Sequence, residues 1–111
     1  MGLDYDVVLV FGIVLTQEEA ALVRDKYYND DHGEYILPEN LFGGLFVGWT
    51  YPYPDAEERV YISLLGHYTN QLSQKEMFEL LSWNRSLWAN FLEHIGISYR
   101  EPELLCLPHI W

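Results

Sequence analysis

Cysteine and basic residues are scarce in this 111-residue sequence, and both shortages restrict what the protein can be. Its one cysteine, Cys106, has no second cysteine with which to form an intramolecular disulfide, as is usual in a reducing compartment. Only six Lys and Arg stand against 17 Asp and Glu, which gives a formal net charge of -11. Because such a surface repels phosphate backbones, the composition argues against direct nucleic-acid binding.

A hydrophobic run long enough to cross a membrane is also lacking. The longest run, Val7 to Leu15, is far shorter than the ~20 residues that a membrane helix needs. Asp4 and Asp6 stand before it, where a secretory signal would carry basic residues. We therefore expect a cytoplasmic protein without a membrane segment. Its length predicts one domain over residues 1–111.

Four apolar, β-branched and aromatic runs predict strands, at residues 5–15, 45–51, 59–67 and 104–107. The first and third are apolar throughout, as expected of central strands, and the second and third should pair as a hairpin. Gly12 indicates a bulge or a close approach of two backbones. Pro108 restricts the last strand to a sheet edge or to the strand's end.

Two capping boxes predict helices. Thr16 and Glu19 begin a helix that ends near Tyr28, and Ser73 and Glu76 begin another. Apolar residues at helical spacing extend the second helix as far as Gly96, over about 22 residues or roughly 33 Å. Trp83 lies off its predicted buried face, which carries Met77, Leu81, Asn84, Trp88, Phe91 and Ile95.

The resulting order, β-α-β-β-α-β, resembles that of ferredoxin-like folds, in which an antiparallel sheet carries two helices on one face. We therefore expect an α+β domain of this kind. The other face of such a sheet must be covered, either by a second copy of the chain or by the irregular segment 34–43 folded back. The sequence thus predicts a homodimer or a larger homo-oligomer.

Motifs for catalysis or metal binding are incomplete. Cys106 and His109 have the two-residue gap of half a zinc site, but no second half is present. His32 stands among carboxylates that lack the spacing of a calcium loop. The serines lie in no nucleophile-elbow context, which leaves His67 as the best candidate for an acid–base role. We assign no catalytic residue, metal ligand or cofactor.

Acidic and aromatic residues indicate an interaction surface instead. Residues 29–58 carry seven carboxylates and no Lys or Arg, so they form either a solubilising loop system or a docking face for a cation or a basic protein partner. Aromatic residues make up 16% of the chain and either complete the core or lie at contacts. The interaction candidates are Trp49, Tyr51, Tyr53, Trp83, Asp30, Asp31, Glu57 and Glu58.

Three hypotheses for the function follow. The first is a non-enzymatic, acidic interaction protein that self-associates. The second is an acidic decoy that occupies the basic nucleic-acid site of another protein, as small inhibitors encoded by viruses and mobile elements do. The third is a small metal-assisted or acid–base enzyme. A decoy should spread its carboxylates over one face, and an enzyme should have a pocket into which His and carboxylate groups converge.

Overall fold

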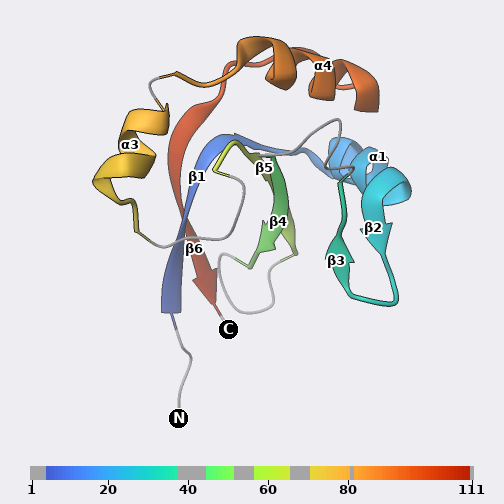
Figure 1. Ribbon diagram of the computed structural model, residues 1–111. Helices are drawn as coiled ribbons and strands as arrows, with labels where there is room; N and C mark the ends of the chain where they lie inside the picture. The colour runs from blue at the N-terminus through green and yellow to red at the C-terminus, as the bar shows by residue number, and fades with distance from the viewer. Residues whose placement is uncertain (1–4, 38–44, 52–56, 66–70, 81, 111) are drawn as a thin grey trace.

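A computed structural model describes residues 5–37, 45–51, 57–65, 71–80 and 82–110. Its main sheet has four strands in the order β4-β5-β1-β6, and every neighbouring pair is antiparallel (Figure 1). With the helices this makes an α+β domain. The strands are β1 (Tyr5–Val14), β4 (Phe46–Thr50), β5 (Arg59–Ser63) and β6 (Glu103–Ile110).

The strand predictions agree with this sheet in several respects. The first and third runs, β1 and β5, occupy its two central positions, and β4 and β5 pair with each other as predicted. Strand β6 is longer than predicted and includes Pro108, and it lies at the sheet edge, where proline is tolerated. Gly12 approaches the backbone of β5 so closely that an added Cβ would lie 1.7 Å from the Ile62 carbonyl oxygen.

The first helix begins as its capping box predicts. Helix α1 (Gln17–Tyr27) is capped by Thr16, whose hydroxyl accepts from the Glu19 backbone N–H, while the Glu19 carboxylate accepts from the Thr16 N–H. A second, two-stranded sheet follows, made of β2 (Tyr28–Asn29) and β3 (Glu34–Tyr35). Strands this short carry no apolar alternation, so the sequence pattern does not predict them.

The single long helix predicted over residues 73–95 is wrong. The chain forms α3 (Gln74–Leu80) and α4 (Arg85–Ile95) instead. Asn84 does not continue the helix, because its side chain accepts from the Leu87 backbone N–H and caps α4. Asparagine readily makes such local bonds, and they compete with helical ones. Gly96, at φ 86°, ends α4 in the left-handed conformation, as predicted.

The apolar core lies between the sheet and two helices. Helices α1 and α4 pack on the same face, around a cluster to which Ile62, Trp88 and Phe91 contribute fully buried side chains. Val8, Val10 and Tyr61 form a second cluster, which contains no helical residue among those described. Because β-strand side chains alternate, this second cluster lies on the opposite face of the sheet. Its members are at most 1% exposed, so the chain itself buries this part of the face that was expected to need a cover.

Candidate interaction surface

The exposed apolar surface lies on the helical side of the sheet, where β1 pairs with β6. Three registered pairs lie side by side there, namely Val7 with Pro108, Leu9 with Cys106, and Phe11 with Leu104. We call these six residues the β1–β6 face. They share the face of Ile13, which belongs to the helix-covered core, because odd positions of β1 point to one side.

Exposure distinguishes this surface from the rest of the sheet. Leu104 is 57% exposed and Val7 is 42% exposed, and Cys106 and Pro108 are also exposed. None of the six residues is charged, although 21% of the chain is. Helices α1 and α4 pack over the C-terminal half of β1 and over β4 and β5. They leave the N-terminal half of β1, with its partner β6, uncovered. The β1–β6 face is therefore a compact uncharged patch on an acidic molecule.

Helix α3 offers a second exposed apolar surface. Met77 is 57% and Phe78 is 63% exposed, so the prediction that Met77 is buried is wrong. The helix packs only loosely against the other elements that the structure describes. In Figure 1, α3 lies on the side of β6, and α1 lies on the side of β4. Phe78 lines a shallow hollow together with Gln74, Lys75 and Ser82.

Trp83, one of the predicted interaction candidates, connects the two surfaces. It follows α3 in the chain, and its ring meets the ring of Phe11 edge-on, with centroids 6.1 Å apart. The Arg85 guanidinium lies over the ring of Trp83, 5.1 Å from its centroid. The apolar surface thus continues from the β1–β6 face onto an aromatic and cationic rim, a composition typical of protein interfaces.

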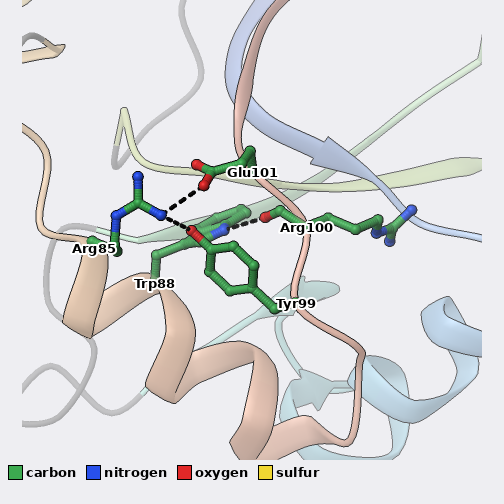
Figure 2. Close-up of polar contacts among 5 residues, drawn as sticks. All are labelled: Arg85, Trp88, Tyr99, Arg100 and Glu101. Carbon is green, nitrogen blue, oxygen red and sulfur yellow. Dashed lines mark hydrogen bonds and ion pairs between the residues drawn. The ribbon is translucent and has the colours of Figure 1, made fainter.

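Polar contacts fix this rim to the segment that precedes β6. Arg85 donates to the Glu101 carboxylate at 2.6 Å and to the Tyr99 hydroxyl at 2.9 Å (Figure 2). The hydrogen bond and charge of Glu101 raise the pKa of Arg85, so the guanidinium stays charged and is neutralised locally. Arg100 points away from this group and pairs with Glu19 of α1 at 2.8 Å. Residues 99–101 are therefore held by both α4 and α1.

The acidic candidates fall into two groups. Asp30 and Asp31 are exposed in the turn between β2 and β3, where the Asn29 side chain accepts from the backbone N–H of Asp31 at 2.9 Å. Glu57 and Glu58 lie against α1 instead. Gln17 donates to Glu57, and Arg24 pairs with Glu58 at 2.8 Å. One group presents its carboxylates to solvent, and the other uses them to hold α1.

The remaining aromatic candidates lie away from the β1–β6 face. Trp49 is half-buried and packs against the core, with its ring centroid 6.4 Å from that of Tyr35. Tyr51 is 38% exposed, and its hydroxyl lies 3.5 Å from the Glu58 carboxylate. Tyr53 lies outside the described residues, as does His67. Of the aromatic candidates that the structure describes, Trp83 is the one whose ring packs against the β1–β6 face, at Phe11.

The described residues give no group of three His, Cys, Asp or Glu that could hold a metal ion. Cys106 and His109 both belong to β6, and the described residues add no further ligand to the half zinc site that their spacing suggested. Burial raises the pKa of Tyr27 and of Tyr35, which keeps both phenols neutral, and nearby Arg24 opposes this for Tyr35. These tyrosines pack in the core rather than in a pocket.

Comparison with protein families, curated proteins and solved structures gives no match to this chain. Within the described ranges, no helix has the length and apolar character to span a membrane. Sequence reasoning missed Val7, Leu104 and Phe78, although one signal was present: residues 104–108 are apolar at both alternating positions, and one side of such a strand needs a cover.

Proposed function

We propose that this chain is a non-enzymatic, acidic interaction protein that self-associates. The observation that carries the proposal is the β1–β6 face, six uncharged residues in three adjacent strand pairs, of which Val7, Leu104, Cys106 and Pro108 are exposed. Apolar patches of this kind mark interaction sites on folded proteins. A copy of the chain carries the same charge of -11, so it meets the least repulsion at a surface without carboxylates.

We further propose that the main elements follow the ferredoxin-like arrangement. The strand order β4-β5-β1-β6 supports this, as do helices α1 and α4 on one face. In such a sheet β6 is an edge strand, and the surface beside it is accessible to another molecule. The fold explains where the apolar surface lies, but it does not by itself indicate a function.

The test is the mass in solution as a function of concentration and salt. We expect a mass above 13.1 kDa that rises with concentration in the micromolar range. We also expect salt to strengthen the association, because raising it from about 0.01 to about 1 M shortens the Debye length from roughly 30 to 3 Å and screens the repulsion between two acidic copies. Leu104→Gln should weaken the association, and the matched control Leu22→Gln, on exposed α1, should not. One mass of 13.1 kDa throughout would refute the proposal.

The second candidate function is the binding of a basic protein partner. It includes the hypothesis of an acidic decoy that occupies the nucleic-acid site of that partner. The observation in its favour is the exposed pair Asp30 and Asp31, in a stretch without Lys or Arg. Attraction between opposite charges weakens as salt screens it. Binding of a basic partner should therefore respond to salt in the opposite direction to self-association, and a single salt series distinguishes the two.

A further inference from the structure

We infer that helix α3 of a second copy covers the β1–β6 face, an inference that rests on the proposed self-association. The chain exposes two apolar surfaces that do not cover each other within one molecule. Met77 and Phe78 of α3 are 57% and 63% exposed, and Leu104 on the sheet is 57% exposed. Burying such side chains is the main favourable term in association, at ~25 cal/mol per Å².

Charge favours a second copy over a different protein at this place. The β1–β6 face carries no charged residue, so it offers nothing to a basic partner, which the carboxylates elsewhere would attract. It also places no carboxylate opposite Glu76 of an incoming α3. A like-charged copy therefore meets the least repulsion here.

An interface of ordinary size would cover about a tenth of the surface of the chain. The chain exposes 7097 Å² in all, and a standard interface buries ~800 Å² on each partner. In a two-fold dimer the contact of α3 with the sheet occurs twice, once in each direction, which doubles the area that one contact buries.

This arrangement differs from two sheets that pack face to face, because each contact joins two different surfaces. Phe78→Gln and Leu104→Gln should each weaken the dimer about tenfold or more, while Leu22→Gln leaves it unchanged. All three side chains are exposed, so the fold should survive, which circular dichroism checks. A mixture of the Phe78→Gln chain and the Leu104→Gln chain retains one intact contact. We expect this mixed dimer to be tighter than either variant alone.

A cysteine scan tests the geometry directly, because Cys106 lies on the β1–β6 face and is exposed. With Gln74→Cys on α3, a mild oxidant should produce a covalent dimer, whereas Leu22→Cys on α1 should not cross-link with Cys106. A covalent dimer of the wild type through Cys106 alone would indicate face-to-face packing and overturn the inference. A Phe78→Gln variant that dimerises like wild type would also overturn the inference. In both cases the chain still self-associates, so the proposed function is not refuted. A monomeric wild type would refute both proposals.

Discussion

The indole Nε1 of Trp88 donates a hydrogen bond of 2.7 Å to the backbone carbonyl of Arg100 (Figure 2). Trp88 is fully buried against the sheet, so one side chain both fills the core and positions the segment that leads into β6. The edge strand, and with it the β1–β6 face, therefore depends on the packing of α4.

We expect Trp88→Ala to lower the free energy of unfolding by ~3–5 kcal/mol, because it leaves a large cavity in the core. Trp88→Phe should cost less, although the Arg100 carbonyl loses its donor, a loss of ~1–3 kcal/mol where the carbonyl stays buried. Trp83→Ala should cost clearly less than Trp88→Ala, since Trp83 is only half-buried and lies outside both helices. Urea unfolding measures all three, and equal losses for the two Ala variants would contradict the prediction.

Gly12 should tolerate no side chain. An added Cβ would lie 1.7 Å from the Ile62 carbonyl oxygen, so Gly12→Ala forces the two central strands apart. We expect a loss of ~3 kcal/mol or more, at the upper end of overpacking effects. Gly33→Ala is the matched control, because its Cβ meets nothing within 4 Å and only the positive φ of 65° opposes it, at roughly 1–2 kcal/mol. A milder loss at Gly12 than at Gly33 would show that the strands adjust.

Some of the fold follows from local patterns. The central strands, the close approach at Gly12 and the two capping boxes were predictable, because each depends on residues next to one another in the sequence or on the apolar alternation. The interrupted helix was not. Asn84 occupies a position on the apolar side of a continuous helix, and only its bond to the Leu87 N–H shows that a new helix begins there.

The interaction surface was harder to predict than the fold. Its residues come from β1 and β6, at opposite ends of the chain, and from α3, and their exposure depends on where α1 and α4 end. The sequence pattern predicted an open surface on the helix-free side of the sheet, and that prediction is wrong, because the exposed surface lies on the helical side. On the helix-free side, Val8 and Val10 are already buried.

We expect the hydroxyl of Tyr27 to add little to the free energy of unfolding or to lower it. The residue is 9% exposed, and the hydroxyl has no hydrogen-bond partner among the described residues. A buried hydroxyl without a partner costs ~1–3 kcal/mol, so Tyr27→Phe should leave the free energy of unfolding unchanged or raise it. Tyr99→Phe is the contrast, since Tyr99 accepts a hydrogen bond from Arg85 and should gain nothing by losing its hydroxyl.

The same residue gives a pH dependence. Burial raises the pKa of Tyr27 above its ordinary value of 10.0, so the folded protein holds the phenol proton more tightly than the unfolded chain does. This stabilisation is fully present below pH 10 and is lost as the pH rises through the folded pKa. Wild type should therefore lose more stability than Tyr27→Phe above pH 10, as urea midpoints would show. Parallel losses in the two proteins would contradict the assignment.

The two acidic groups should behave differently when neutralised. Asp30 and Asp31 lie exposed in a turn whose backbone is held by Asn29, so Asp30→Asn with Asp31→Asn should change the free energy of unfolding by no more than ~0.5 kcal/mol. Glu58→Gln removes the ion pair with Arg24, which is partly exposed, and should cost up to ~1 kcal/mol.

The rate of association with a basic partner should also differ between variants of the two acidic groups. If such a protein is recovered by affinity purification, the Asp30 and Asp31 double variant should slow its association and flatten the salt dependence, because those carboxylates face solvent without a paired cation in residues 29–58. Glu57→Gln with Glu58→Gln should have a smaller effect, since Arg24 already neutralises Glu58 and Gln17 binds Glu57. Equal slowing by both double variants would mean that all four carboxylates act as one docking surface. Association of the Asp30 and Asp31 variant as fast as wild type at low salt would mean that the turn serves only solubility, and the partner should then be sought at Trp83 and the β1–β6 face.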